Sequence, residues 1–393
     1  MFFHRLLDML TERKEDIVAK TDPKDFFRQR RSAAQVKAEF LVAFFPVWCE
    51  MLLSEKDPEA KVLYLDANAG LGLEEEGAQP VSFQVLKSIF ARSGGRLNLN
   101  KAVHPFLYEA NKALAATLPQ LATELPFYAD LQQEPQFLHL PEAQLALQEQ
   151  EAAADAVFLS LDPFGNKFSQ ELWARALGQD HTHFLLQFEF KRLTAALSSQ
   201  KPDHPLHTLL GSRLPALKAL LAKTSHAAKK ETYVLKAFAE SLLEKGYQAT
   251  RFRINVPGKD QSNHHVWFVS RHELAHTRFK EVVLPYSDVQ EDGVPLLGAN
   301  LKAVRLLVPE YSKYLEFSLV NLIEDLLQNT AVYNSMALEK IYEKHNVGKN
   351  YSKANYQTAF EKLKEQGKIT LLNPKTGQVV YKLTFATRIK FNP

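Results

Sequence analysis

Short apolar runs alternate along the middle of the chain with segments in which apolar residues recur at helical spacing. Runs that are apolar at nearly every position are typical of parallel strands covered by helices on both faces. The pattern predicts a doubly wound α/β domain over residues 61–285, with about seven strands and room for an antiparallel last strand. The predicted strands are Val62–Leu65, Phe106–Tyr108, Phe137–Leu140, Ala156–Leu161, His183–Phe188, Ala249–Ile254 and Val266–Val269, and the predicted helices between them include Val81–Arg92, Asn111–Leu125, Ala143–Glu151 and Glu231–Lys245.

Helical patterns also fill residues 1–60, and we expect this segment to pack on the α/β core. Its clearest part is Ala33–Leu53, where an apolar stripe with a period of 3.6 residues includes Cys49. Because proline removes a helical hydrogen bond, Pro46 is expected to kink or divide this helix. No cationic residue adjoins Cys49 in the sequence, which favours a packing role over a reactive thiol.

The stretch 191–230 is longer than a connection between two strands requires. It contains two helical patterns, Leu206–Leu210 and Leu214–Ala222, with prolines as breaks. We predict a helical insertion over the ligand-binding edge of the sheet. Two interpretations stay open: a lid or substrate-contacting element, and a helical hairpin without a direct role.

The strand pattern stops after Val283, and the last part of the chain has a different order of elements. Residues 286–313 contain Asp292-Gly293 and Pro295 and are predicted to be a linker. Residues 314–393 give three helical patterns and then two extended runs around a glycine-containing turn, which is the order of a winged helix. The predicted helices are Tyr314–Gln328, Ser335–His345 and Ser352–Gln366, and the extended runs are Ile369–Leu372 and Val379–Phe385.

The first predicted strand runs into Asp66, and the loop after it carries Asn68, Gly70 and Gly72 at two-residue spacing. A nucleotide-binding loop must turn tightly and approach its ligand closely; glycine allows positive φ there, and Asn68 tolerates it. An acidic residue at this strand end suits the cationic amino group of S-adenosylmethionine (SAM), whereas Glu74–Glu76 after the loop argue against a phosphate. The alternative is a strand–turn–helix in which the glycines serve packing alone.

Two further acidic residues follow the next strands in the order that a nucleoside site requires. Glu109 ends the second strand, where an acidic side chain commonly accepts hydrogen bonds from ribose hydroxyls. It lies 43 residues after Asp66, against the usual ~20, so residues 93–105 are expected to be an insertion. Glu142 follows the third strand and is a candidate acceptor for an adenine amino group, with an ordinary surface loop as the alternative.

The fourth predicted strand ends in Asp162-Pro163-Phe164-Gly165. Methylation of an exocyclic amine needs an acceptor that holds the NH2 group, a rigid turn that fixes this acceptor, and an aromatic face that stacks the extruded base. Asp162, Pro163 and Phe164 are the residue types for these three tasks, and Gly165 completes the turn. The alternative is a strand end at which Asp162 caps the next helix and Phe164 packs in the core.

These motifs resemble those of methyltransferase-like families. The Asp162 loop resembles the Asp-Pro-Phe-Gly motif of tRNA guanine-N2 dimethyltransferases, and the whole layout is similar to the three-Cys-motif partner (TcmP) family of bacteria. The TcmP resemblance covers nearly the full length and implies a Rossmann-like SAM-methyltransferase-type fold, SAM as cofactor, and a partner protein from a neighbouring gene. It rests on the helical start with Lys37, the Asp66 to Gly72 loop, Tyr108-Glu109, the Asp162 loop, the run from His265 to Ser270 and the basic tail.

The first loop departs from the TcmP pattern, which is usually Asp-x-Phe-Ala-Gly-Pro-Gly. Asn68 stands in place of the aromatic residue, and Leu71 in place of the proline. Three hypotheses therefore remain. The chain is a SAM-dependent methyltransferase that acts on an exocyclic amine, expected to belong to a nucleic acid, or it is a catalytically degenerate, methyltransferase-like partner or adaptor that works with another protein in a bacterial defence or modification system. The third hypothesis is a nucleic-acid-binding defence or regulatory module.

Composition narrows the class of protein further. The 393 residues are 46% hydrophobic and 24% charged, which is ordinary for a globular chain. Without an apolar run of membrane-spanning length or a signal-peptide pattern, and with one cysteine, we expect a cytoplasmic protein with no membrane contact, disulfide or cysteine metal cluster. Adjacent His264 and His265 alternate across a strand, and His181 and His183 have no third ligand near them in sequence, so no metal site is predicted.

Charge is distributed unevenly, although the net charge is only +3. Residues 331–393 contain ten Lys and one Arg against four Glu, a net charge of +7, which leaves −4 for the remainder. A basic tail favours a polyanionic partner, and a solvated helical surface is the alternative. The candidate nucleic-acid contacts are Lys353, Lys362 and Lys364 on the third helix and Lys375 in the turn, although winged helices also mediate protein contacts.

Overall fold

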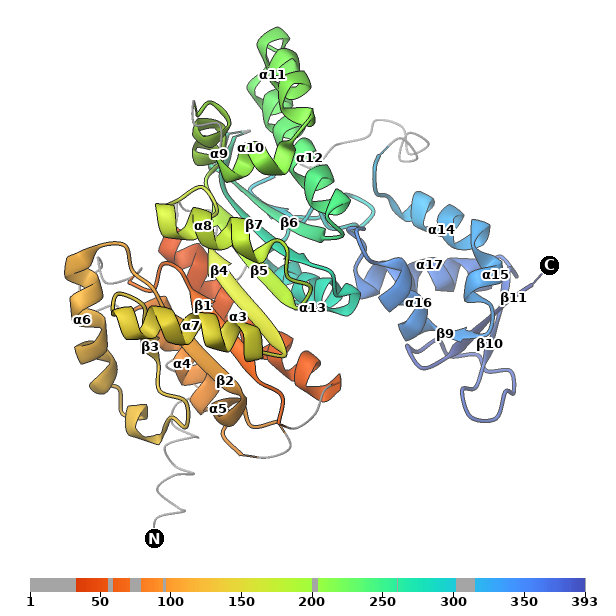
Figure 1. Ribbon diagram of the computed structural model, residues 1–393. Coiled ribbons are helices and arrows are strands. Elements are labelled where there is room, and N and C mark those ends of the chain that lie inside the picture. Colours follow the sequence, from red (N-terminus) through yellow and green to blue (C-terminus); the bar gives the residue numbers. More distant parts are fainter. Residues whose placement is uncertain are drawn as a thin grey trace.

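The computed structural model describes residues 33–55, 59–70, 79–94, 97–199, 204–259, 261–301 and 315–392. A sheet of eight strands forms the centre of the body (Figure 1), and the strands are ordered β3-β2-β1-β4-β5-β7-β6-β8 across it. The strands are β1 Val62–Asp66, β2 Val103–Leu107, β3 Gln136–Phe137, β4 Ala156–Leu161, β5 Thr182–Phe188, β6 Gln248–Asn255, β7 Ser262–Ser270 and β8 Gly298–Ala299.

The order of the strands reverses between β1 and β4. β1 pairs in parallel with β2 on one side and with β4 on the other, while β7 runs antiparallel to both β5 and β6. Every residue of β1 and β4 is buried, which is the physical origin of their near-continuous apolar runs. The prediction of a Rossmann-like α/β fold is therefore confirmed. Ligands of such sheets bind at the carboxyl ends of the strands, beside the point of reversal.

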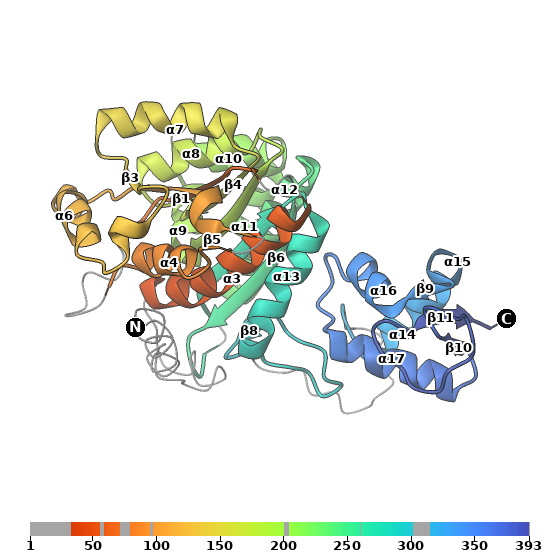
Figure 2. The same ribbon diagram turned by 90° about the horizontal axis from the view of Figure 1, so that it is seen from below.

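Helices cover both faces of the sheet, as Figures 1 and 2 show from two directions. One apolar core joins the sheet to α3, α4 and α13, and a second joins it to α7, α8 and α12. The helices of the body are α3 Ala33–Glu55, α4 Val81–Phe90, α5 Leu99–Ala102, α6 Lys112–Thr123, α7 Pro141–Ala153, α8 Lys167–Ala176, α9 Phe190–Leu197, α10 Pro205–Leu210, α11 Arg213–Lys223, α12 Ala227–Glu244 and α13 Glu273–Val283, with 3-10 turns at Tyr128–Asp130 and Leu284–Tyr286.

Helix α3 continues through Pro46, so the expected division of this helix is wrong. Proline in a helix interior costs about 3 kcal/mol. The residues around it are fully buried, among them Phe44, Phe45 and Trp48, and each such side chain contributes roughly 1.5–3 kcal/mol on burial. Packing therefore outweighs the lost hydrogen bond. Cys49 is buried in the same helix, and burial raises the pKa of its thiol well above the ordinary value.

The segment predicted as a helical insertion forms α9, α10 and α11. Helix α11 buries only Leu217 and extends from the body at the top of Figure 1. Arg213 at its start joins it to α12 through ion pairs with Glu240, at 2.9 Å, and Glu244. Helix α9 follows directly after β5 and brings Arg192 to the carboxyl end of the sheet.

The tail is a winged helix with its own apolar core and a three-stranded sheet ordered β10-β11-β9. The predicted run Val379–Phe385 is not the second strand of its hairpin; β11 is, and in that run only Val379 bridges to β10. The reason is packing, because Ile389 and Phe391 of β11 are buried whereas Tyr381 is exposed. The elements are α14 Leu319–Gln328, α15 Thr330–Tyr333, β9 Met336–Ala337, α16 Leu338–His345, α17 Lys353–Glu365, β10 Ile369–Leu372 and β11 Arg388–Phe391.

The described part of the predicted linker contacts both body and tail. β8 pairs in parallel with β6 of the body, while Val294 is buried in the core of the tail. The Asp292 carboxylate accepts a hydrogen bond from the backbone N–H of Leu319, at 2.7 Å, at the start of α14. Residues 302–313 of this segment, residues 1–32, and Gly72 lie outside the described residues.

Candidate active site

Asp66, Glu109 and Asp162 lie at one edge of the sheet, at or just beyond the carboxyl ends of β1, β2 and β4. These three strands are neighbours, and backbone hydrogen bonds continue past their ends. The N–H of Tyr108 donates to the carbonyl of Asp66, at 2.8 Å, and the N–H of Ala67 donates to the carbonyl of Ser160, at 2.9 Å. Parallel pairing alone therefore brings together three acidic positions that lie far apart in the sequence.

Asp66 is fully buried and paired with a cation of the protein itself. Lys37 of α3 forms an ion pair with its carboxylate and donates a second hydrogen bond, at 3.2 Å, to the carbonyl of Asn68. The Asp66 carboxylate also accepts from the hydroxyl of Tyr64, at 3.3 Å, and from the N–H of Asn68, at 3.0 Å. Burial and this carboxylate raise the pKa of Tyr64 well above its ordinary value. Within the described residues, Asp66 thus already has a cationic partner and two further hydrogen bonds.

The described part of the glycine loop approaches Glu109 rather than adopting a left-handed turn. Neither Asn68 nor Gly70 is among the residues with positive φ, which corrects the reason given for them from sequence. The N–H of Gly70 donates to the Glu109 carboxylate at 3.0 Å, and a Cβ at this position would lie 2.6 Å from the same oxygen. The other Glu109 oxygen accepts from the N–H of Asn111 at 2.8 Å. A side chain at residue 70 would therefore displace the Glu109 carboxylate from this position.

Asp162 is almost completely buried, and its two carboxylate oxygens have different partners. One accepts from the backbone N–H of Phe164, at 2.9 Å, in the turn that contains Pro163. The other accepts from the Arg192 guanidinium, also at 2.9 Å. Burial raises the pKa of Asp162 to about 6, although Phe164 and Arg192 act in the opposite direction. Gly165 completes the turn, and its N–H donates to the carbonyl of Asp162 at 3.1 Å.

A pocket of about 150 Å³ opens beside Asp162 at the carboxyl ends of β1, β4 and β5. Two polar groups that line it, the Ser160 hydroxyl and the Gln187 side-chain amide nitrogen, are buried without a hydrogen-bond partner among the described residues. Buried polar groups are nearly always paired, so these two indicate a polar ligand or water. The pocket is lined by Val36, Lys37, Asn68, Ser160, Leu161, Asp162, Gln187, Phe188, Glu189, Arg192, His264 and His265.

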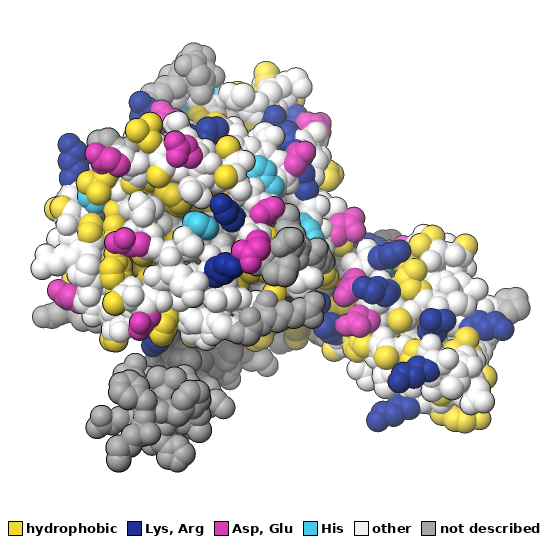
Figure 3. Space-filling view, turned by 60° about the horizontal axis from the view of Figure 1, so that its bottom comes forward, with side chains coloured by type: hydrophobic (Ala, Val, Ile, Leu, Met, Phe, Trp, Pro, Cys, Tyr) yellow, Lys and Arg dark blue, Asp and Glu magenta, His cyan; other side chains and the backbone are white. Residues whose placement is uncertain are grey.

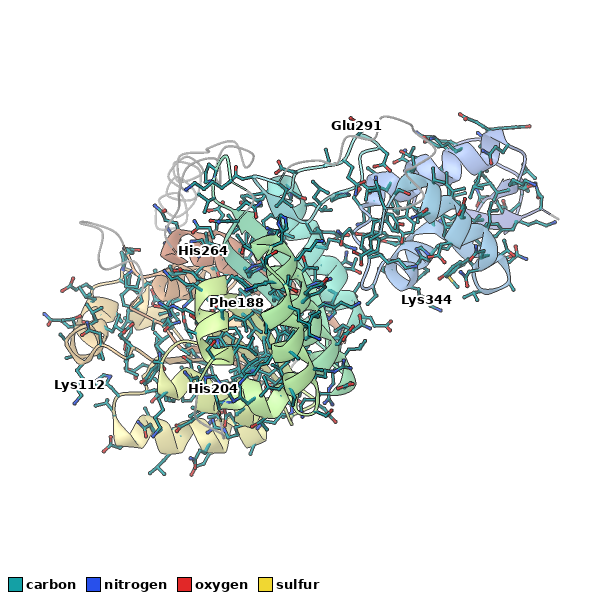
Figure 4. All side chains as sticks on the ribbon, turned by 90° about the horizontal axis from the view of Figure 1, so that it is seen from above. Lys112, Phe188, His204, His264, Glu291 and Lys344 are labelled. Atoms are coloured by element: carbon teal, nitrogen blue, oxygen red, sulfur yellow. The ribbon has the colours of Figure 1, made fainter. Side chains whose placement is uncertain are left out.

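Phe188, at the end of β5, is among the residues that line this pocket, and its buried ring stacks on His265. Phe164, which the sequence suggested for base stacking, packs edge-on against Phe188 and Phe238, with ring centroids 5.1 and 5.7 Å apart. It lines a second hollow of about 430 Å³ on the other side of Arg192. Figure 4 labels Phe188 and His264 on the body, with Lys344 apart on the tail.

Sequence reasoning missed most of the pocket wall contributed by β5, α9 and β7. The polar residues Gln187 and Glu189 at the end of an apolar run were a usable signal. His264 and His265, which the sequence analysis set aside as ligands of a metal, both line the pocket at the start of β7. A register shift between β6 and β7 lies next to them at Ile254 and Asn255, and such irregularities are common beside binding sites.

His265 is held by buried groups behind the pocket. Its Nε2 atom lies 3.2 Å from the Glu231 carboxylate and 3.0 Å from the Ser262 hydroxyl, and its ring stacks on Phe188. Burial lowers the pKa of His265. Burial alone would raise the pKa of Glu231, but hydrogen bonds from His265 and Ser262 and the nearby Arg253 lower it. The ring of His265 is therefore fixed in position and predominantly neutral at neutral pH.

The remaining candidate residues lie away from the pocket. Glu142 is exposed in the first turn of α7 and is not part of the pocket wall. In the tail, Lys353 pairs with Glu281 of the body at 2.8 Å, and Lys364 donates to the carbonyl of Tyr381 at 2.6 Å. Lys362 and Lys375 are exposed.

The residues at this edge match SAM in part. The Glu109 oxygens each retain a lone pair for a ribose hydroxyl, and the N–H of Gly70 holds one of these oxygens in place. Asp66, which was expected to bind the cationic amino group of SAM, already forms an ion pair with Lys37. Sites for drug-sized ligands are roughly 300–1,000 Å³, so the pocket of about 150 Å³ beside Asp162 suits a single base.

Two negative findings apply to the described residues. They contain no group of three or more His, Cys, Asp or Glu side chains placed to hold a metal ion. None of their helices is long and apolar enough to cross a membrane.

Comparison with known protein families matches residues 309–376 to the GMT-like wHTH domain family. The match covers a large part of the tail and none of the eight-stranded sheet, and it agrees with the winged-helix fold of the tail. A search of curated proteins finds no match.

Proposed function

We propose that the chain is a SAM-dependent methyltransferase that acts on an exocyclic amine, with nucleic acid as the source of the amine. One observation carries this proposal: a buried carboxyl group, Asp162, lines a base-sized pocket where the order of strands reverses. The winged-helix tail supports a nucleic-acid partner.

Asp162 would hold the amine in this pocket. Its carboxylate accepts a hydrogen bond from the NH2 group and thereby directs the nitrogen lone pair, while Arg192 and the Phe164 N–H keep the carboxylate in place. Phe188 would form an apolar part of the wall, and Ser160 and Gln187, whose buried polar atoms lack partners among the described residues, would lie beside the base edge. The proton that the nitrogen loses on methylation passes to Asp162, whose pKa of about 6 suits this task near neutral pH.

SAM would supply the methyl group when bound. Glu109 would accept from its ribose, with Gly70 fixing the Glu109 carboxylate, and Glu142 remains the candidate for the adenine. The loop with Asn68, Gly70 and Gly72, next to Asp66, would hold the methionine part. The Lys37–Asp66 ion pair makes hydrogen bonding by the backbone of this loop more important than a direct contact with Asp66.

Titration calorimetry with SAM and its demethylated product tests cofactor binding. Wild-type protein is expected to bind both, and Asp162→Asn to bind them with little change. Methyl transfer to total cellular nucleic acid, followed by mass spectrometry of the nucleosides, should fall about 100-fold or more in Asp162→Asn. Asp155→Asn, at the opposite end of β4, is the matched control and should keep activity. Folded wild-type protein that binds neither ligand would remove the enzyme proposal.

One observation favours the second candidate function, a catalytically degenerate partner protein. Lys37 already neutralises Asp66, so no cationic ligand is needed to stabilise this buried carboxylate. In that case purified protein should bind neither SAM nor its product and should co-purify with another polypeptide. The TcmP resemblance is the reason to expect such a partner.

A further inference from the structure

Two side chains in the first turn of α17 make contacts with the body and with the segment that precedes the tail. In helix-turn-helix proteins the N-terminal residues of the recognition helix contact base edges. Here Lys353 pairs with Glu281 of α13 at 2.8 Å, and Asn355, which is buried, donates to the carbonyl of Gly293 at 3.0 Å. From α16, Glu343 lies 3.9 Å from Arg278 of the body. The end of α17 that would enter a groove is thus occupied by contacts within the chain.

The hairpin formed by β10, β11 and residues 373–387 between them is here called the wing, and its two strands lie on the side of the tail away from the body (Figures 1 and 2). Phe385 of the connecting segment instead lies near the junction with the body, with its ring centroid 5.7 Å from the Lys353 ammonium. Alternate residues of β11 divide between its two faces. Ile389 and Phe391 are buried in the tail core, whereas Arg388 and Lys390 are exposed opposite Leu372 and Thr370 of β10. The outer face of the wing is therefore cationic and accessible.

The wing contains no compensating acidic residue. Residues 366–393 include four Lys and one Arg and no Asp or Glu. Within the described chain, none of these five cations, nor Lys364 beside the wing, forms an ion pair. Figure 3 shows Lys and Arg side chains across the tail, and acidic side chains gathered where it meets the body. The wing thus carries cations without carboxylates, whereas the acidic side chains in this view lie where the tail meets the body.

An aromatic side chain stands among these cations. Tyr381 is 83% exposed, and Val379 beside it is 59% exposed. The loop that carries them is held by backbone hydrogen bonds, including Val380 N–H to the carbonyl of Leu371 at 2.9 Å, and by Lys364, which donates to the carbonyl of Tyr381. An exposed ring in a segment that also carries Lys382 and is bonded by Lys364 matches a partner with dense negative charge and flat apolar faces.

We propose that the wing, and not helix α17, is the nucleic-acid-binding surface of this protein. Arg388, Lys390 and Lys382 contact phosphates, and Tyr381 contacts a base or sugar. This proposal deepens the proposed function and rests on its nucleic-acid partner, but it does not depend on catalysis. Either DNA or RNA offers the required chemistry.

Fluorescence anisotropy with the full chain tests this proposal without added cofactor. The probes are labelled duplex DNA, single-stranded DNA and an RNA hairpin, each titrated at several salt concentrations. The double variant Arg388→Gln/Lys390→Gln should weaken binding at least 10-fold and reduce the slope of log affinity against log salt by about 2, because each phosphate contact contributes about 0.9. Tyr381→Ala should weaken binding about 5-fold or more without changing this slope. Comparison of the three probes identifies the preferred nucleic acid.

Lys362→Gln on α17 and Lys344→Gln on α16 are the matched controls, since both remove an exposed cation of the tail outside the wing. Both should bind like wild type. The proposal is overturned if Lys362→Gln loses affinity while the wing variants do not, or if the wild-type chain binds only an acidic protein and no nucleic acid at low salt. If the wing variants lose nucleic-acid binding and the wild-type chain shows no methyl transfer, the wing is supported as the binding surface and the enzyme proposal is wrong.

Discussion

At the scale of a residue, Asp66 and Asp162 lie at the ends of neighbouring strands but differ in their partners. This difference determines whether each carboxyl group can exchange a proton near neutral pH. Asp66 is fully buried and paired with the equally buried Lys37. Asp162 is paired with Arg192, whose side chain is half exposed, and its pKa is raised to about 6 by burial. A buried charge that is fully paired serves structure, whereas an incompletely compensated one near neutral pH can exchange a proton.

The raised pKa of Asp162 predicts a dependence of stability on pH. Because its folded pKa is about 6 and the ordinary value is 3.8, the folded state binds this proton more tightly than the unfolded state. The stabilisation is fully present below pH ~4 and is lost as the pH rises through ~6. Asn cannot titrate, so urea unfolding at pH 4, 6 and 8 should show Asp162→Asn gaining stability over wild type by roughly 2–3 kcal/mol across this range. A difference that is constant with pH would contradict the assignment.

At the scale of an element, side-chain hydrogen bonds of neighbouring residues determine where α17 begins. The Ser352 hydroxyl accepts from the N–H of Asn355 at 3.3 Å, and the Asn355 side chain accepts from the N–H of Ser352 at 2.8 Å, which is a reciprocal capping box. The helix predicted from the sequence also begins at Ser352. Helix α3 shows the opposite case, because its local signal at Pro46 is overruled by packing.

Loss of this cap should destabilise the tail. Ser352→Ala removes the acceptor of the Asn355 N–H at the first turn of α17, and N-cap replacements of this kind cost about 1 kcal/mol. Thr358→Ala, at an exposed position in the middle of the same helix, should be neutral or slightly stabilising. Thermal unfolding monitored by circular dichroism compares the two variants. Equal effects would show that the cap contributes nothing specific.

At the scale of the whole molecule, α13 connects the sheet to the winged helix. Lys280 of α13 is buried, and its ammonium donates to the carbonyl of Asn346, at 3.1 Å, to the Asn346 side chain and to the carbonyl of Lys349. Burial lowers the pKa of Lys280 well below its ordinary value. The carbonyls that it binds follow the C-terminus of α16, where a cation is favoured. This buried contact fixes the direction in which the wing points.

Removal of the Lys280 ammonium should uncouple the tail from the body. Lys280→Met keeps much of the side-chain volume but leaves these acceptors without their donor, a loss of roughly 2–3 kcal/mol. Small-angle X-ray scattering should show a larger radius of gyration, and calorimetry should resolve separate transitions for body and tail. Lys340→Met, at an exposed position on α16, should leave both unchanged. An unaltered radius of gyration for Lys280→Met would show that other contacts hold the junction.

The sequence by itself determined the α/β fold, the winged helix and the edge at which Asp66, Glu109 and Asp162 lie. It did so because strand burial leaves apolar runs, and because the carboxyl ends of parallel strands share one edge. The candidate roles of these residues as cofactor and substrate contacts remain predictions.

Only the tertiary structure decided which partners these residues meet. Lys37 reaches Asp66 from a separate helix, and the pocket wall comes from Phe188, Arg192 and His265 on three other elements. The contact of Lys280 with the end of α16 turns the first turn of α17 inward and the wing outward. A local pattern reports whether a side chain is buried, but its partner depends on how distant elements pack, and the chemistry of a site depends on that partner.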